Sequence, residues 1–239
     1  MKKLIPILLA ISLSACTFNV KTDNNIETAI QKATNAASVS VTDGIEGSTS
    51  GFSGSKKEIL VDLGPNAASD KASIMSVAYH TADTAYTLTL ADKSKMPTFF
   101  RVKVKAGGMT SDNFDFKSAH LAIGKTLVTK INGFMKSVVD KHYSDLGKYM
   151  EPGLDLSSIV TLFQKFDAQI PGGVAHYRFV GLQEAVGVHN PDKKPMEIIQ
   201  AWVLISGSDA NGNSLPMLFV GNPATGQLSS VYVNPGASK

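Results

Sequence analysis

The chain has 239 residues, of which 43% are hydrophobic and 18% charged, and its formal net charge is +3. That length allows one large domain or two small ones with a buried core. The small net charge, with Arg101 and Arg178 as the only arginines, excludes a nucleic-acid-binding protein. Because Cys16 is the only cysteine, disulfides within the chain, thiolate metal sites and cysteine nucleophiles further along are also excluded.

The N-terminus has the organisation of a secretory signal peptide. Two lysines precede an apolar run over residues 4–13. This run is well short of the roughly 20 apolar residues that a membrane-spanning helix needs. It ends in Leu13-Ser14-Ala15-Cys16, where two small residues precede a cysteine that has no disulfide partner. We therefore expect residues 1–15 to be cleaved as a signal peptide rather than retained as an anchor.

The tetrapeptide Leu13-Ser14-Ala15-Cys16 resembles the lipobox of bacterial lipoproteins. The resemblance implies that Cys16 carries a diacylglycerol thioether and an amide-linked acyl chain, and two or more acyl chains hold a protein stably on a membrane. Lipoproteins retained at the inner membrane of Gram-negative bacteria commonly have an aspartate after this cysteine, whereas this chain has Thr17. The resemblance thus implies an outer-membrane lipoprotein that faces the periplasm, provided that the source is Gram-negative.

The segment after the lipobox is polar and rich in small residues. Residues 44–54 are dense in glycine and serine, and we interpret residues 16–55 as the lipidated N-terminus followed by a flexible tether. Within it, Ile26, Ala29 and Ile30 recur at helical spacing, which allows a weak helix over residues 25–38.

Residues 56–108 are expected to form an N-terminal β-rich region. Apolar residues alternate with polar ones at several places, which predicts strands: Ile59 and Val61, then Ile74, Val77 and Tyr79, then Tyr86, Leu88 and Leu90, and finally Phe100, Val102 and Val104. The last set alternates with the basic row Arg101, Lys103 and Lys105. That row either faces solvent or protects a strand edge, or it meets an anionic partner such as lipid headgroups or glycan. Ala106-Gly107-Gly108 is the best boundary of this region.

From Ser118 the hydrophobic period changes to 3.6 and continues to Leu146, which predicts a long amphipathic helix ending at Gly147. Asp155 is placed to cap a second helix, which Pro171-Gly172-Gly173 would end. Strands follow, and residues 198–205, with Trp202, are apolar on both faces and predict a central strand.

Two turn signals complete the C-terminal region, residues 109–239. Asn211-Gly212 and residues 222–227 predict hairpin connections. We therefore predict an α+β fold with antiparallel sheets, a long central amphipathic helix and a C-terminal helix-helix-sheet module. The sequence leaves open whether the two sheets form one layer or two domains.

The order helix, helix and antiparallel strands over residues 118–235 is similar to the C-terminal part of nuclear-transport-factor-2-like modules. The resemblance rests on that element order and on the turn at residues 222–227. It implies a curved sheet wrapped on helices around a conical pocket, a fold that both enzymes and binding domains use.

Several short motifs resemble binding or catalytic motifs, but each lacks the surrounding residues or structure that such a site needs. Residues 119–126 fit a loose phosphate-loop pattern, yet they lie inside the helical stripe rather than after a buried strand. Ser53-Gly54-Ser55-Lys56 with Ser111-Asp112-Asn113 matches two of three motifs of serine penicillin-binding enzymes, without the third. Residues 209–213 offer oxygen ligands for calcium, but a hairpin explains them and the distal glutamate is missing. The histidines, which are not spaced as metal ligands, are His80, His120, His142, His176 and His189.

The sequence thus predicts no catalytic, cofactor-binding or metal-binding residue, and Cys16 is the one functional residue assigned, as a lipidation site. We expect a non-enzymatic binding or interaction module of the cell envelope, anchored to the membrane, with a possible protein partner and no nucleic acid. One alternative is a small-ligand-binding or isomerase- or hydrolase-like enzyme with a conical pocket, marked by a buried carboxylate of raised pKa ringed by Trp202, Tyr177 or Phe179. The other is an immunity-type lipoprotein that blocks a periplasmic toxin.

Overall fold

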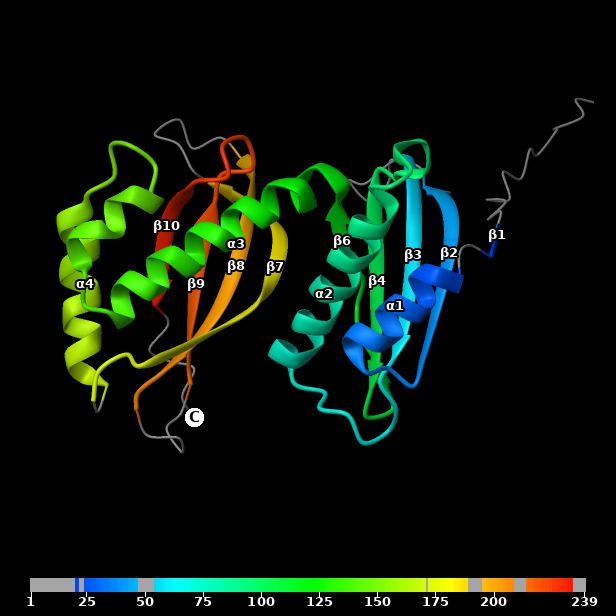
Figure 1. The fold of residues 1–239 in the computed structure, drawn as a ribbon, viewed down its shortest axis with the longest axis horizontal. Coiled ribbons are helices and arrows are strands. Elements are labelled where there is room, and N and C mark those ends of the chain that lie inside the picture. Colours follow the sequence, from blue (N-terminus) through cyan, green and yellow to red (C-terminus); the bar gives the residue numbers. More distant parts are fainter. Residues whose placement is uncertain are drawn as a thin grey trace, which may run out of the picture.

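The computed structural model describes residues 20–21, 24–46, 54–170, 172–188, 195–208 and 214–233. It has an α+β fold, as the sequence predicts, in which two sheets lie side by side with helices on the same side of both (Figure 1). Several residues singled out from the sequence lie outside the described residues: Leu13-Ser14-Ala15-Cys16, His189 and residues 209–213, which include Asn211-Gly212.

The first sheet is built from the N-terminal half of the chain. Its strand order is β1-β2-β3-β4-β5, and β6 pairs with β4. The strands are β1 (Val20–Lys21), β2 (Ser38–Glu46), β3 (Gly54–Asp62), β4 (Phe99–Ala106), β5 (Met109–Thr110) and β6 (Phe114–Lys117). The sheet is mixed rather than purely antiparallel, since β3 and β4 run parallel and are joined by a crossover through a helix.

The prediction of strands at residues 74–90 is wrong, because this crossover segment is a helix. The segment forms α2 (Lys71–Thr89), which Asp70 caps by accepting a hydrogen bond from the Ser73 N–H at 3.0 Å. The buried side chains of α2 recur every three or four residues, as on one face of a helix: Met75, Ala78, Tyr79, Ala82, Ala85 and Tyr86. The short helical turn η2 (Lys93–Lys95) then leads into β4.

The prediction of a flexible tether is also wrong for residues 24–46. Residues 24–46 form α1 (Asn24–Thr34) and β2, so that part of the segment belongs to the first sheet and its helical cover. Ile26 and Ile30 of α1 and Val41 of β2 are buried in the core. The small residues are accommodated because β2 pairs with β3 along its whole length, which supplies the main-chain hydrogen bonds.

The glycine pair predicted as a domain boundary is instead a hairpin turn inside the first sheet. Gly107 and Gly108 have φ values of 58° and 82°, which suit glycine, and they join β4 to β5. The chain leaves the first sheet only at Lys117, the last residue of β6, where α3 (Ser118–Val139) begins.

Helix α3 crosses from the first sheet onto the second (Figure 1). It ends earlier than predicted, at Val139, because Lys141 takes a left-handed conformation with φ of 61°. The N–H groups of Lys141 and His142 then donate to the carbonyls of Val138 and Ser137, which closes the helix end. The 3-10 helix η3 (Tyr143–Tyr149) follows, and α4 (Leu156–Gln169) begins after Asp155, which caps it as predicted.

The second sheet is antiparallel with the order β10-β9-β8-β7. Its strands are β7 (His176–Val188), β8 (Pro195–Ser206), β9 (Leu215–Gly221) and β10 (Leu228–Val233). The prediction of an interior strand at residues 198–205 is confirmed, although only the face with Ala201 and Val203 lies deep in the core. Trp202, on the opposite face, is half-buried. The turn at residues 222–227 joins β9 to β10 as predicted.

Aromatic side chains fill the space between α3, α4 and the second sheet. The ring of Phe134 lies 5.2 Å from that of Phe163 and 5.3 Å from that of Phe219, between centroids, and all three side chains are fully buried. These rings form part of the core between the helices and the second sheet.

Candidate functional site

A pocket lies where the two sheets meet edge to edge. It has a volume of about 420 Å³ and is lined by residues 113–117 of β6 and the turn before it, residues 183–186 of β7, and Glu197 of β8. β6 pairs with β4 on one side and β7 pairs with β8 on one side, and no described strand occupies the other edge of either. The groove therefore runs between two open strand edges.

Ring packing beneath the groove holds these two edges in place. Tyr79 of α2 packs its ring edge-on against Phe116 of β6 at 6.4 Å and against Phe179 of β7 at 5.5 Å, between centroids. Gly181 of β7 comes so close to α2 that an added Cβ would lie 3.3 Å from the carbonyl oxygen of Met75. α2 thus joins the two sheets, and the groove is formed before any ligand arrives.

A polar cluster closes one end of the groove. Glu184 of β7 accepts a hydrogen bond from the main-chain N–H of Lys117 at 2.5 Å, at the start of α3, where a carboxylate is favoured by the helix dipole. The Lys117 ammonium pairs with Glu197, and this hydrogen bond lowers the pKa of the Glu197 carboxyl. Both acids lie on the same side of the β7–β8 hairpin, since Glu184 is paired with Ile199 and Glu197 with Val186.

His120 in the first turn of α3 completes this cluster. Its Nδ1 lies 3.1 Å from Oε1 of Glu184, at an angle that makes no hydrogen bond, and its Nε2 lies 3.5 Å from Oε2 of Glu197. Because both ring nitrogens face carboxylates, neither faces a substrate, as a general base must. The geometry suits a positioning role in the groove wall better than proton transfer.

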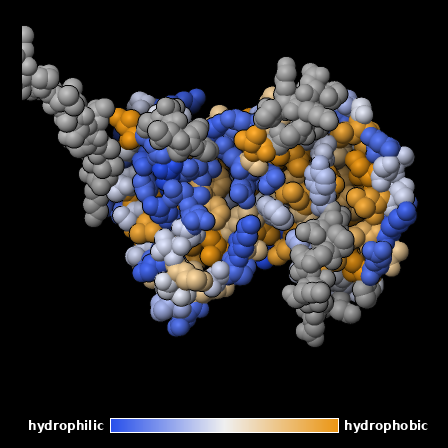
Figure 2. Space-filling view, turned by 180° about the vertical axis from the view of Figure 1, so that it is seen from behind, coloured by the Kyte–Doolittle hydropathy of each residue, from blue (hydrophilic) through white to orange (hydrophobic). Residues whose placement is uncertain are grey.

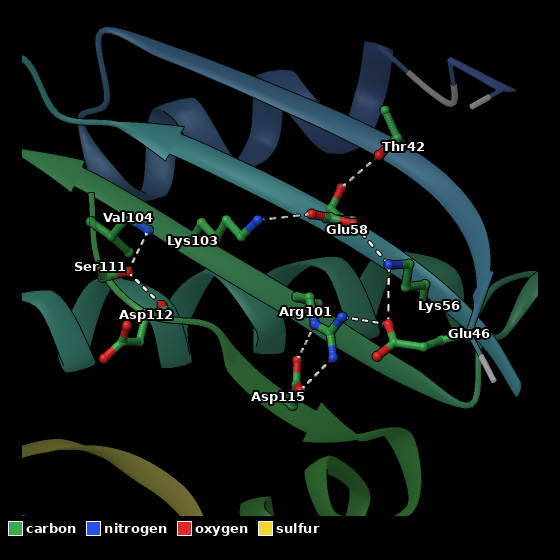
Figure 3. A network of polar contacts seen from close by, with 10 residues as sticks. All are labelled: Thr42, Glu46, Lys56, Glu58, Arg101, Lys103, Val104, Ser111, Asp112 and Asp115. Atoms are coloured by element: carbon green, nitrogen blue, oxygen red, sulfur yellow. Dashed lines mark hydrogen bonds and ion pairs between the residues drawn. The ribbon is translucent and has the colours of Figure 1, made fainter. Parts of the chain in front are cut away.

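The basic row of β4 does not form an anion-binding surface. Arg101 is only 8% exposed, and its guanidinium donates to Asp115 at 2.7 and 2.8 Å and pairs with Glu46 (Figure 3). The hydrogen bonds that Arg101 donates to Asp115 raise the pKa of the guanidinium. β4 is an interior strand, so the alternative of a charge-protected edge is also wrong.

The other charges of this sheet face are likewise compensated. Lys103 pairs with Glu58 at 3.3 Å and Lys105 with Asp62 at 2.9 Å. Seen from behind, the side of the first sheet is largely hydrophilic, whereas the side of the second sheet is largely hydrophobic (Figure 2).

Two further sequence candidates fall wholly or partly on described residues, and these residues form no site. Residues 119–126 lie within α3, as expected, so they form no phosphate loop. Lys56 lies in β3 and pairs with Glu46 and Glu58, while Ser53 lies outside the described residues. Among the described residues, no group of three or more His, Cys, Asp or Glu side chains is arranged to hold a metal ion.

In the described part of the chain, the buried carboxylate that would indicate an enzyme is not found among the three aromatic rings expected to surround it. Tyr177 donates to the carbonyl of Asn132, Phe179 packs on Tyr79, and Trp202 lies on the other face of the sheet, so these rings surround no common carboxylate. Where the pKa of a described carboxyl group is shifted, it is lowered, because hydrogen bonds and neighbouring cations outweigh burial: Glu58, Asp62, Asp70, Asp92, Asp140, Asp155, Asp167 and Glu197.

Sequence reasoning missed the groove residues Glu184, Glu197 and His120. Glu184 and Glu197 come together only through the register of the β7–β8 hairpin, and His120 only through the start of α3. The signal that would have found them is the placement of acids on one face of two consecutive strands.

Within the described ranges no helix is both long and apolar enough to cross a membrane. Comparison with known protein families, with curated proteins and with solved structures finds no match to this chain.

Proposed function

We propose that this protein is a lipid-anchored lipoprotein of the cell envelope that binds a ligand in the β6–β7 groove without transforming it. The anchoring part is supported by Leu13-Ser14-Ala15-Cys16, whose resemblance to a lipobox implies a body held at a membrane surface. The binding part rests on the groove, which has a volume of about 420 Å³ and is held open by the packing of α2 on both sheets.

The absence of catalytic chemistry in the groove supports binding rather than turnover. Its charged groups are arranged as pairs: Lys117 with Glu197, and Asp115 with Arg101. Glu184 is engaged by the start of α3, and the nitrogens of His120 face carboxylates. A general acid or base needs an open path to the substrate, whereas these groups are engaged with one another.

A tryptophan in the groove wall tests this proposal. Val186 is 74% exposed on β7, so Val186→Trp fills the groove without disturbing the core. Ile45 on β2 is 83% exposed and does not line the groove, so Ile45→Trp is the matched control. The full chain, in mild detergent, is immobilised and exposed to an envelope extract, and the retained material is analysed by mass spectrometry.

We expect wild type and Ile45→Trp to retain the same ligand at a stoichiometric level and Val186→Trp to lose it. Equal retention by all three proteins would show that the groove is not the binding site. Conversion of a small molecule in the extract that Glu184→Gln abolishes would overturn the non-enzymatic part of the proposal.

A further inference from the structure

We infer that the ligand of the groove is an extended polypeptide segment that pairs with the open edge of β6. This inference rests on the proposed function and names the chemical class of the ligand. Three observations carry it: the direction of the main-chain groups of β6, the apolar residues in the groove wall, and the charge of the lining.

The main chain of β6 presents hydrogen-bonding groups to the groove. The N–H of Ser118 points toward β4 and donates to the Thr98 carbonyl at 3.0 Å, whereas the N–H of Lys117 points the other way and reaches Glu184. Successive residues of a strand alternate in direction, so the N–H and C=O of Asp115 point away from β4 and into the groove.

A strand edge repeats this donor and acceptor pair every two residues, or about 7 Å. The main chain of an extended peptide has the same repeat, and strand addition to an open edge is an established way of binding peptides. The Lys117 N–H is already satisfied by Glu184, which fixes one end of the pairing register.

The apolar part of the groove wall suits alternating side chains. β7 contributes Ala185 and the exposed Val186, and Phe114 of β6 is half-buried beside them. Alternate side chains of an added strand point to opposite faces, so apolar residues at every second position would contact this wall.

The charge of the lining favours a basic segment. The groove is lined by the acids Asp115, Glu184 and Glu197 and by one base, Lys117. Arg101 compensates Asp115 and Lys117 compensates Glu197, which leaves the Glu184 carboxylate in excess, next to the end of the groove. A lysine or arginine in the segment complements that excess.

The test begins with a library of random ten-residue peptides displayed on phage and selected on the full chain in mild detergent. We expect the selected sequences to alternate apolar and polar residues and to carry at least one lysine or arginine. A selected peptide is then made with a fluorescent label, and its affinity is measured by fluorescence anisotropy.

Asp115→Pro and Asp115→Ala form the decisive pair of variants. Both remove the carboxylate that pairs with Arg101, but only proline removes the N–H that points into the groove, and that N–H does not serve the β4–β6 ladder. We expect Asp115→Pro to bind the peptide about tenfold more weakly than Asp115→Ala, as the loss of one main-chain hydrogen bond predicts.

Hydrogen exchange on the wild-type chain keeps the test independent of how the proline variant folds. Saturating peptide should slow exchange at the Asp115 amide about tenfold or more. Failure to select any peptide, or equal binding by the two variants with unchanged exchange at Asp115, would overturn the inference. If Val186→Trp loses a retained ligand that is a glycan or small molecule, the proposed function stands and only the polypeptide inference fails.

Discussion

Arg101 has a different role in the structure from the one that the sequence suggests. In the sequence it belongs to a basic row that suggests an anionic partner, whereas in the fold it is buried between Asp115 and Glu46. A buried guanidinium is stable only when it is paired, because the loss of its hydration must be offset. The Arg101 charge is therefore compensated within the first sheet, and this face offers no unpaired arginine to a ligand.

Asp155, which caps α4, is a residue whose contribution should depend on pH. It accepts hydrogen bonds from the Ser157 and Ser158 N–H groups and from both hydroxyls, and the bonds from these serines, led by Ser158, lower the pKa of Asp155 to about 2. A carboxyl group with a lowered pKa stabilises the fold above its ordinary pKa of 3.8 and loses that effect as the pH falls toward 2.

Asp155→Asn keeps a capping side chain but does not ionise, which makes it the matched variant. We expect the wild type to have the higher Tm at pH 7, and the difference in Tm to shrink as the pH falls from about 4 to about 2. Circular dichroism melting curves across this range measure it. A difference that stays constant over the range would contradict the assigned role of the ionised carboxylate.

At the scale of elements, α2 is the part of the fold that most determines the groove. It lies on the first sheet, it packs against β7 at Gly181, and its Tyr79 holds Phe116 and Phe179 beneath the groove. The alternation of Tyr86, Leu88 and Leu90 with threonines imitates a strand, but the helix places these residues in different directions.

This difference gives a direct test of α2. A strand would place Tyr86 and Leu88 on one face, whereas the helix leaves Tyr86 8% exposed and Leu88 41% exposed. Tyr86 also packs edge-on against Phe100 of β4. We expect Tyr86→Ala to lower the free energy of unfolding by about 3 kcal/mol and Leu88→Ala by less than about 1 kcal/mol, as measured by urea denaturation. Equal losses would contradict the helical assignment.

At the scale of the whole molecule, the two sheets act together because α2 and α3 contact both. The groove exists only in this arrangement, since β6 and β7 belong to different sheets and each would otherwise have a solvent-exposed edge. Open edges are a hazard for soluble proteins, and a ligand that covers them also protects the protein.

Anchoring is the remaining prediction at this scale. We expect Cys16 to be acylated, so that a metabolically incorporated fatty-acid probe labels the wild type and not Cys16→Ala. Thr17→Asp, which leaves the cysteine in place, should still be labelled and controls for changes near the cleavage site. Equal labelling of wild type and Cys16→Ala would refute lipidation at this residue.

The elements whose pattern is local were predictable from the sequence. The amphipathic stripe starting at Ser118 predicted α3, Asp155 predicted the start of α4, and the apolar run at residues 198–205 predicted an interior strand. Caps and hydrophobic periods are properties of neighbouring residues, so they can be interpreted without knowing the fold. The α+β class followed from them.

The tertiary structure alone decided the rest. The Ala- and Ser-rich residues 24–46 belong to the first sheet and its helical cover only because β3 is there to pair with β2 and the core is there to bury Ile26 and Ile30. The groove depends on which strand edges stay open and on the register that brings Glu184 and Glu197 beside Lys117. Strand order and register are set by contacts between segments far apart in the chain, and no local pattern specifies them.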